Sequence, residues 1–426
     1  MTPEINRRIE HLRRSDIPDG YKKTSAGILP AAWDVYILED CLSRVERPVE
    51  VNPNQLYTQI GIRSHGKGLF YKEPVTGSVL GNKAVFWIEP DCFIVNIVFA
   101  WEQAVGKTTQ SEVGMIGSHR FPMYRPVNDR VDVDYLIYYF LTKRGTDILE
   151  AASPGGAGRN KTLGQDRFLK SKIILPPIEE QRKIAAILTS QDRVIELKEK
   201  LLAEKQRQKK YLMQQLLTGK KRLPGFSGKW KLTPLKKLTE KQKKKNHGFQ
   251  YRLVLSNSTQ HGIVSQDQEF DKEIANKERI DGYYIVIPGA FVYNPRISVT
   301  APCGPINVNE TGQTGIMSPL YIVFTISSPQ ISQDFLKYYF QSSCWHKYVK
   351  GVANYGARHD RISISDGDFF DMPIPFPAID EQNYIARELS TADREIDLLR
   401  QAIEQEKQKK KALMQLLLTG IVRVKV

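Results

Sequence analysis

Two glycine-rich stretches come close to the phosphate-binding loop of nucleotide-hydrolysing enzymes. Residues 61–68 have the spaced glycines and the lysine, but Gly68 stands where a serine or threonine hydroxyl would hold Mg²⁺. Residues 106–108, Gly-Lys-Thr, match the end of the motif, but Trp101 occupies the place of its first glycine. A basic surface loop is the simpler interpretation of each stretch, so neither predicts nucleotide binding.

Other combinations of reactive side chains are also incomplete. Asp91 and Glu102 have the order of a metal-dependent nuclease, but Ala104 stands where the lysine should be. The Asn-Pro pairs at residues 52–53 and 294–295 lack the second proline and the aromatic residue with which adenine methyltransferases hold a flipped base. We find no convincing pair of nucleophile and base.

The cysteines and histidines have no metal-binding spacing. The four cysteines are far apart without a CxxC pair, and the seven histidines form no HxxxH motif. This pattern argues against a zinc knuckle or a disulfide framework and fits a reducing cytoplasm. No stretch approaches the roughly 20 apolar residues of a membrane-spanning helix, and the first residues lack the apolar core of a secretory signal. We therefore expect a cytoplasmic chain with no catalytic, metal or cofactor site of its own.

Composition points to a soluble, basic protein. The 426 residues suggest two to four structural units, and 41% are hydrophobic. Lysine and arginine number 62 against 47 aspartates and glutamates, which gives a formal net charge of +15. This excess favours a polyanionic partner such as nucleic acid, although proteins of membrane surfaces and ribosomes share it.

The strongest feature is an internal repeat. Residues 176–181 read Pro-Pro-Ile-Glu-Glu-Gln, and residues 377–382 read Pro-Ala-Ile-Asp-Glu-Gln. The segments at 211–219 and 412–420 both end in Leu-Leu-Thr-Gly and lie at the same offset, with no gap between the two matches. A repeat of this kind indicates a duplicated structural unit.

Each copy of the repeat has the features of one long helix. Pro177 or Pro377 precedes it, where a missing N–H costs nothing, and two carboxylates follow in the first turn. No glycine or proline then occurs until Gly219 or Gly420, which suits a left-handed stop. About 40 residues at 1.5 Å each predict a rod of roughly 60 Å.

Apolar residues form a narrow seam along both predicted helices. In the second helix they alternate steps of four and three, and in the first they come as pairs at 187–188, 194–195 and 201–202. This spacing favours pairing of the two helices as an antiparallel coiled coil over packing of each helix on its own domain. The residues expected to pair the helices are Leu188, Ile195, Leu202, Leu389, Ile396 and Ile403.

A segment of about 150 residues with a different composition precedes each helix. These segments are rich in short β-branched and aromatic runs separated by Gly, Pro and Asn, as expected of sheet with loops. We predict an α+β fold in which two globular mixed α/β domains are separated by the two long helices, with pseudo-two-fold internal duplication. The predicted segments are an N-terminal helical segment (1–21), a first domain (22–172), a first helical spacer (173–220), a second domain (221–372) and a second helical spacer (373–426).

The order of these segments resembles the DNA-specificity (S) subunit of a Type I restriction–modification system, over essentially the whole chain. The resemblance rests on the Pro-Pro-Ile-Glu-Glu-Gln start of one helix, the Leu-Leu-Thr-Gly ends of both, and a Leu-Pro…Trp pattern at the entry to each variable domain. Residues 373–378 depart from the plainer first copy, which affects only the start of the second helix.

The resemblance implies a non-catalytic subunit that binds double-stranded DNA. Each target-recognition domain would read one half of a bipartite, asymmetric site, and the helices would set the gap between the halves. The helices would also dock two methyltransferase (modification) subunits and the restriction/translocase subunits. S-adenosylmethionine, ATP and Mg²⁺ are expected in those partners.

Polar residues in Gly- and Asn-rich loops are the candidate DNA contacts. In the first domain they are Arg63, His65, Lys67, Lys107, Thr108, His119, Arg120, Arg159 and Lys161. In the second domain they are Lys243, Lys244, Lys245, Asn257, Arg296, Asn354, Tyr355, Arg358, His359 and Arg361.

Two other functions remain open on the sequence. A coiled-coil scaffold with incidental charge predicts no DNA shift and no co-purifying methyltransferase. A self-sufficient DNA methylase or nuclease with an unrecognised site predicts that the isolated chain depends on S-adenosylmethionine or Mg²⁺.

Overall fold

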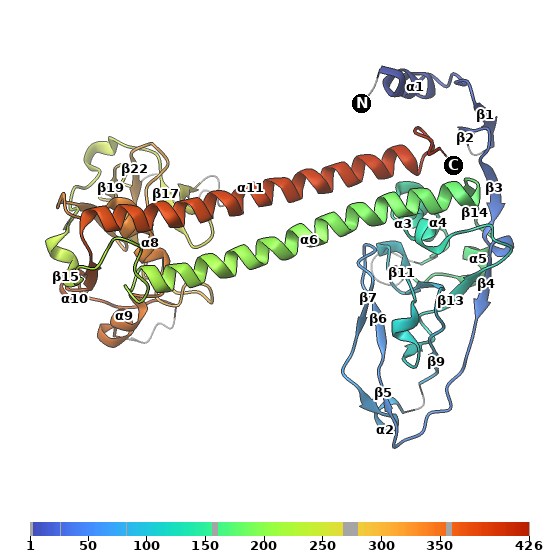
Figure 1. The fold of residues 1–426 in the computed structure, drawn as a ribbon, viewed down its shortest axis with the longest axis horizontal. Coiled ribbons are helices and arrows are strands. Elements are labelled where there is room, and N and C mark those ends of the chain that lie inside the picture. The colour runs from blue at the N-terminus through green and yellow to red at the C-terminus, as the bar shows by residue number, and fades with distance from the viewer. Residues whose placement is uncertain are drawn as a thin grey trace. The chain divides into compact units, whose positions relative to one another are not determined.

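The computed structural model describes residues 3–25, 27–81, 83–155, 161–266, 280–354 and 360–425 (Figure 1). The chain forms two units, of which unit 1 comprises Met1–Lys198 with Ala402–Val426, and unit 2 comprises Glu199–Gln401. Two helices of 39 residues each, α6 (Ile178–Leu216) and α11 (Ile379–Leu417), contribute one part to each unit. Unit 1 is therefore completed by a segment that is distant in sequence, whereas unit 2 is one continuous stretch. The predicted α+β fold with two long helices is confirmed.

Unit 1 is built from short strands and short helices before α6. Its helices are α1 (Pro3–Arg13), α2 (Gly77–Leu80), α3 (Val133–Phe140), α4 (Lys143–Ala151) and α5 (Gln165–Leu169), with 3-10 turns η1 (Leu38–Asp40), η2 (Ala100–Glu102) and η3 (Gln110–Glu112). Its strands are β1 (Tyr21–Thr24), β2 (Gly27–Pro30), β3 (Asp34–Ile37), β4 (Leu42–Val45), β5 (Leu56–Tyr57), β6 (Ile60–Ile62), β7 (Leu69–Tyr71), β8 (Val75–Thr76), β9 (Val85–Trp87), β10 (Phe93–Val95), β11 (Val105–Lys107), β12 (Ile116–Ser118), β13 (Met123–Pro126) and β14 (Lys172–Leu175).

Unit 2 has the same kinds of elements. Its helices are α8 (Gln333–Gln341), α9 (His346–Val352) and α10 (Asp366–Phe370), with 3-10 turns η4 (Leu235–Lys237) and η5 (His247–Phe249). Its strands are β15 (Lys231–Pro234), β16 (Thr239–Lys241), β17 (Leu255–Ser258), β18 (Gly262–Ser265), β19 (Tyr284–Val286), β20 (Phe291–Tyr293), β21 (Ile306–Val308), β22 (Gly315–Met317), β23 (Ile322–Ile326) and β24 (Pro373–Phe376).

The two units share one sheet topology. The largest sheet of unit 1 is antiparallel with the order β11-β10-β13-β4, and that of unit 2 is antiparallel with the order β21-β20-β23-β16. Two-stranded sheets repeat as well, because β9–β12 corresponds to β19–β22 and β3–β14 to β15–β24. The duplication seen in the helices therefore extends to the domains, where the sequences have diverged.

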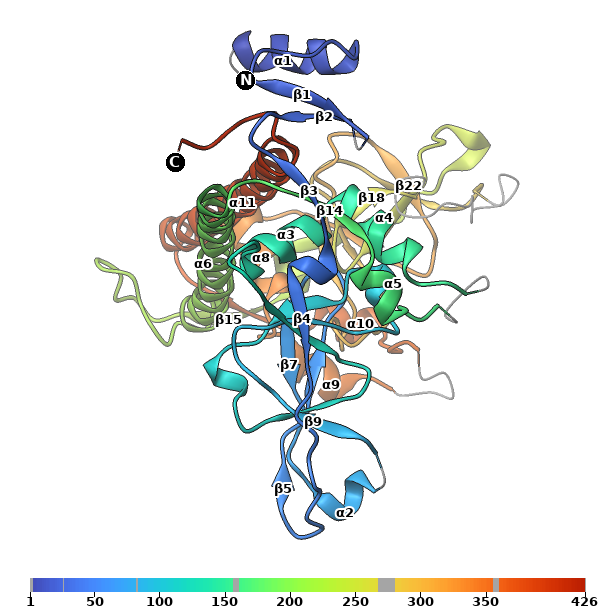
Figure 2. The same ribbon diagram turned by 90° about the vertical axis from the view of Figure 1, so that its right-hand side faces the viewer.

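The core of each domain lies between this sheet and the short helices. In unit 1 the rings of Phe93, Phe140 and Phe168 lie within 5.3–6.1 Å of one another. In unit 2 the rings of Phe291 and Phe324 stack at 5.3 Å. Because aromatic side chains bury large apolar areas, these clusters fix the helices onto the sheet. Figure 2 shows α3 beside α6, with which it shares the core of unit 1.

Within each unit, α6 and α11 run antiparallel. In unit 1 the Gln191 amide donates to the Glu406 carboxylate at 2.8 Å, and the Lys410 ammonium lies 2.6 Å from Asp192. In unit 2 the Lys205 ammonium donates to Glu395 at 2.7 Å. Later positions of α6 thus meet earlier positions of α11.

The six residues expected to pair the helices are mostly buried. Leu188, Ile195 and Ile403 are buried in unit 1, Leu389 and Ile396 are buried in unit 2, and Leu202 is half-buried.

The other members of the apolar pairs in α6 turn outward. Ile187, Val194 and Leu201 are exposed, because neighbouring helical residues are rotated by about 100° and only one of each pair can face inward. The member expected to pair the helices is in each case the less exposed one.

Candidate nucleic-acid interface

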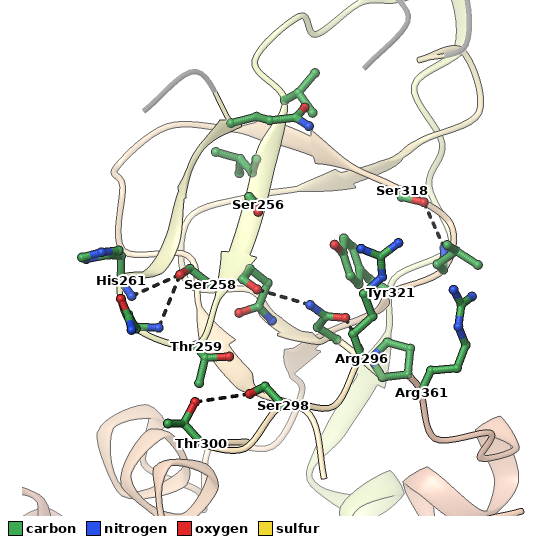
Figure 3. A pocket seen from close by; sticks show the side chains of 18 of the residues that line it. Ser256, Ser258, Thr259, His261, Arg296, Ser298, Thr300, Ser318, Tyr321 and Arg361 are labelled. Carbon is green, nitrogen blue, oxygen red and sulfur yellow. Dashed lines mark hydrogen bonds between the residues drawn. The ribbon is translucent and has the colours of Figure 1, made fainter. Parts of the chain in front are cut away.

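A polar cleft opens in unit 2 beside the loop that follows β20. Its volume is about 790 Å³, and Figure 3 shows the side chains on its walls. Most of the lining residues have side chains that can form hydrogen bonds, and two of them are the arginines Arg296 and Arg361. The others are Ser256, Asn257, Ser258, Thr259, Gln260, His261, Gln266, Tyr283, Asn294, Ser298, Thr300, Ser318 and Tyr321. Such a surface offers donors and acceptors suited to nucleic acid.

Backbone pairing brings the two arginines to the same wall of the cleft. Arg296 and Arg361 form an isolated antiparallel bridge, in which the Ile362 N–H donates to the Pro295 carbonyl at 2.9 Å. Figure 3 shows the two side chains next to each other on the side of Tyr321. A loop and a segment 65 residues later in the chain, at positions 296 and 361, thus supply two guanidinium groups to one surface.

Asn257 was expected to contact DNA, and the structure gives its amide a different role. The side chain is 4% exposed. Its amide nitrogen donates to the Val292 carbonyl at 2.7 Å, and its amide oxygen accepts from the Asn307 side chain at 2.7 Å. Because both polar atoms are engaged inside the domain, Asn257 holds the floor of the cleft and has no free group for a base.

The other candidates of unit 2 divide into two groups. Lys243, Lys244 and Lys245 are exposed just after β16, as phosphate contacts need to be. Asn354 is exposed and pairs with Ser363 through backbone bonds. Three further candidates lie outside the described residues, namely Tyr355, Arg358 and His359.

In unit 1 the exposed candidates lie on two turns. Arg63, His65 and Lys67 occupy the connection between β6 and β7, and His119 and Arg120 occupy that between β12 and β13. The Arg63 guanidinium also donates to the Leu69 carbonyl and lies 5.1 Å from the centre of the Phe70 ring. These side chains can reach a ligand, and their role stays a prediction.

Two candidates of unit 1 are tied to the protein itself. Thr108 is fully buried; its hydroxyl donates to the Glu89 carbonyl at 2.6 Å and accepts from the Cys92 N–H. Its expected contact with DNA is therefore corrected to a structural role. Lys107 is half-buried and donates to Asp134 at 2.8 Å; although burial opposes the charged form, this partner raises the Lys107 pKa.

Two candidates of the first domain remain, Lys161 and Arg159. The Lys161 ammonium lies 5.5 Å from the centre of the Trp101 ring, which holds it on the protein surface. Arg159 lies outside the described residues.

Most residues of the cleft lining were not predicted from the sequence. Ser256, Ser258, His261, Ser298 and Thr300 were not predicted, although polar residues crowd around both β17 and the loop after β20. A run of polar residues inside a β-rich segment was the available signal. It could not show that the two stretches face each other.

The start of each long helix is held by the same arrangement of three side chains. In unit 1 the buried Glu180 accepts from the Trp33 indole at 3.2 Å and from the Arg423 guanidinium at 2.6 and 2.7 Å. In unit 2 the buried Glu381 accepts from Trp230 at 3.0 Å and from Arg222 at 2.6 and 2.7 Å. Hydrogen bonds to these carboxylates raise the pKa of both arginines.

We call these two arrangements the carboxylate locks. They give a structural role to the second acidic residue at the start of each long helix, Glu180 or Glu381. Sequence reasoning gave it only a favourable interaction with the helix dipole. Glu180 joins the start of α6 to two distant segments, since Trp33 lies at the entry to the first domain and Arg423 follows α11. Glu381 joins the start of α11 to the stretch after α6, which carries both Arg222 and Trp230. Bidentate Arg–carboxylate pairs fix geometry as well as charge.

A second duplicated set joins each domain to both helices. Tyr138 donates to Asp192 of α6 at 2.8 Å, and Lys410 of α11 binds the same carboxylate. In unit 2 Tyr338 donates to Asp393 of α11 at 2.9 Å, and Lys209 of α6 binds that carboxylate. Burial first, and then the neighbouring carboxylate, raise the pKa of both tyrosines, which therefore remain neutral donors.

The described residues contain no group of three or more His, Cys, Asp or Glu side chains arranged to hold a metal ion. No helix in the described part of the chain is both long and apolar enough to cross a membrane.

Comparison with known proteins gives a consistent result. Residues 89–206 match the family model described as the type I restriction modification DNA specificity domain. The chain is 24% identical to a putative type I restriction enzyme MjaX specificity subunit from Methanocaldococcus jannaschii, over 96% of this chain and 97% of that protein. It is 25% identical to the MjaVIII specificity subunit of the same organism, over 78% and 80% respectively.

Solved structures share the fold. The HsdS subunit from Thermoanaerobacter tengcongensis superposes with a TM-score of 0.54 at 18% identity, covering 92% of this chain and 98% of that one. A chain from a structure on complex assembly and conformational transition of the type I R-M system gives a TM-score of 0.59 at 18% identity, covering 92% and 99%. The family match, the two curated relatives and the two solved structures agree: the chain is similar in sequence and in fold to the DNA-specificity subunits of type I restriction–modification systems.

Proposed function

We propose that this chain is the sequence-recognition subunit of a type I restriction–modification complex, in which each unit reads one half of a bipartite DNA site. One observation carries the proposal. The two units repeat the same strand order, carboxylate lock and Tyr–Asp–Lys set, whereas their loops carry different polar residues. A repeated scaffold with different loops suits one task performed on two different sequences.

The charge supports DNA as the ligand. A net charge of +15 supplies salt-dependent attraction to phosphates, which is the main sequence-independent part of DNA affinity. Exposed basic residues on loops of both units are placed to contribute to it. Sequence choice then rests on the side chains that reach base edges.

Similarity to the specificity subunits supports a non-catalytic role for the chain. The chemistry is assigned to partners: methyltransferase subunits that use S-adenosylmethionine, and restriction/translocase subunits that use ATP and Mg²⁺. The two long helices are the proposed docking elements for the methyltransferase subunits. The domain boundaries predicted from the sequence define the parts to be exchanged in experiments.

Mapping of methylated adenines in the host genome tests the proposal. With the gene present we expect one interrupted, asymmetric motif to carry N6-methyladenine, and with the gene deleted we expect that motif to be unmethylated. A plasmid copy of the gene is the control, since it must restore the same motif. Persistence of every motif after deletion would contradict the proposed function.

The proposed spacing role of the helices makes a second prediction. Removal of seven residues from α6 and the facing seven from α11 keeps the apolar seam in register. We expect the gap in the methylated motif to become shorter while both half-sites stay the same. A three-residue deletion is the control, because it rotates the seam out of register and should abolish methylation. An unchanged gap after the seven-residue deletion would refute the spacing role.

A coiled-coil scaffold and a self-sufficient enzyme remain the alternatives that these experiments separate. The scaffold predicts that deletion leaves all methylation intact. The enzyme predicts methyl transfer or cleavage by the chain alone.

A further inference from the structure

The loop after β20 carries the features of a reading element, and its counterpart in unit 1 has a different sequence. In unit 1 Asn96 follows β10, and its side-chain oxygen accepts from the Val98 N–H at 3.1 Å. In unit 2 Asn294 follows β20 and accepts from the Arg296 N–H at 3.0 Å in the same turn. Both asparagines are buried. The two loops therefore leave equivalent strands through one turn and then diverge.

The segment after the turn differs between the units. In unit 1 the chain enters η2, where the Trp101 indole donates to the Val98 carbonyl at 3.2 Å. In unit 2 the chain projects as a tight turn in which Ser298 and Ala301 exchange backbone hydrogen bonds at 3.1 and 3.2 Å. Two domains that recognise different sequences need a position of this kind, with a constant base and a variable tip.

The tip of the unit 2 loop presents an apolar side chain to solvent. Val299 is fully exposed, and the backbone bonds between Ser298 and Ala301 hold it in place. A single exposed valine carries no meaning alone. Here it lies on a rigid turn three residues from Arg296, so the loop offers a methyl-bearing contact next to a guanidinium group.

The second guanidinium belongs to Arg361. Its Nε is buried and has no hydrogen-bond partner among the described residues, and its terminal nitrogen lies 3.4 Å from Asp360. The Asp360 carboxylate is exposed, so this ion pair is weak and can exchange for a ligand. The amide network of Asn257, Asn294 and Asn307 supports the loop from below.

We propose that the loop at residues 295–301, together with Arg361, is the base-reading element of unit 2. This assignment rests on the proposed function. Arg296 and Arg361 bind the O6 and N7 acceptors of guanine in the major groove, the commonest specific contact of arginine. Val299 contacts the C5-methyl group of a thymine. The half-site read by unit 2 accordingly contains both a G·C and an A·T pair.

The test uses the full chain with its co-purified methyltransferase subunits and fluorescent duplexes that carry the mapped motif. Each base pair of both half-sites is replaced in turn, and the affinity is measured at several salt concentrations. For Arg296→Ala and Arg361→Ala we expect discrimination at one G·C pair to fall about 5- to 150-fold. The slope of log affinity against log salt concentration, the salt slope, should not change, because no phosphate contact is lost.

A single-group substitution in the DNA tests Val299. Replacing the contacted thymine by deoxyuridine removes one methyl group, which should weaken binding of the unaltered complex about 4-fold. The complex with Val299→Ala should bind both duplexes equally. Equal binding of both duplexes by the unaltered complex at every thymine of the half-site would contradict the assignment of Val299.

Two controls accompany the variants. Lys244→Ala should lower affinity equally for all sequences and reduce the salt slope by about one. Arg252→Ala removes an exposed arginine of unit 2 that does not line the cleft, and it should leave discrimination intact. Thermal unfolding of each complex checks the fold, and the half-site read by unit 1 serves as an internal standard.

The outcomes separate this inference from the proposed function. If the unaltered complex recognises no bipartite motif, the proposed function fails. If it recognises one and the arginine variants lose affinity uniformly with a lower salt slope, these arginines contact phosphate and the base-reading assignment is wrong. Unchanged discrimination by all three variants, or altered discrimination in the other half-site, would also overturn it.

Discussion

Replacing residues 222–372 with the equivalent domain of a relative will change one half of the methylated motif and leave the other half intact. The exchanged segment contains nearly all strands of unit 2 and its cleft, so the reading surface of that unit is replaced as a whole. The effect is all-or-none at one half-site. It is measured by mapping N6-methyladenine in a host that carries only the chimaera.

The junctions of this exchange matter for the design. Arg222 and Trp230 lie inside the exchanged segment and must bind Glu381, which stays with the recipient. A donor domain should therefore carry Arg and Trp at the corresponding positions. The reciprocal exchange of residues 22–172 is the matched control and should change only the other half-site. If both halves of the motif change, or neither does, the idea of two independent readers is wrong.

Removing the carboxylate lock of unit 2 should destabilise that unit strongly. Glu381→Ala removes a nearly fully buried carboxylate that accepts from the Arg222 guanidinium and the Trp230 indole. The guanidinium is 25% exposed and keeps the Gly228 carbonyl as an acceptor, so the loss costs about 2 kcal/mol, less than for a fully buried ion pair. We expect the midpoint of thermal unfolding of unit 2 to fall by about 6 °C.

The matched control is Glu388→Ala on the same helix, because that glutamate is exposed. It should shift the midpoint by no more than about 1 °C. A double variant, Arg222→Met with Glu381→Leu, replaces the pair by apolar groups and should recover much of the lost stability. The prediction fails if Glu381→Ala unfolds at the same temperature as the unaltered chain. Glu180→Ala should have the equivalent effect on unit 1.

Local signals made the long helices readable from the sequence. The prolines, the first-turn carboxylates and the glycine stops act within a few residues of one another, and the structure places α6 and α11 within those limits. The heptad spacing also indicated which residues face a partner. The residue chosen from each pair, such as Leu188 and not Ile187, is the less exposed one in the structure.

The candidate DNA contacts were less accessible to sequence reasoning. Residue type and loop context selected four residues alike: Arg296, Arg361, Thr108 and Asn257. In the structure the two arginines line the cleft of unit 2, whereas the side chains of Thr108 and Asn257 are buried. Burial decides this difference. It depends on strands and loops that are distant in sequence, so no local pattern reports it.

The sequence by itself determined the duplication, the two long helices, the resemblance to a family and the absence of a recognisable catalytic motif, because these depend on repeat spacing and on residues close together in the chain. Only the tertiary structure decided that Glu180 and Glu381 bind the helix starts to distant segments and that Arg296 meets Arg361 across a β-bridge. Contacts of this kind join residues 65 to 243 positions apart. They form only when the sheets and both helices have packed, so geometry in space, and not spacing along the chain, assigns these side chains their roles.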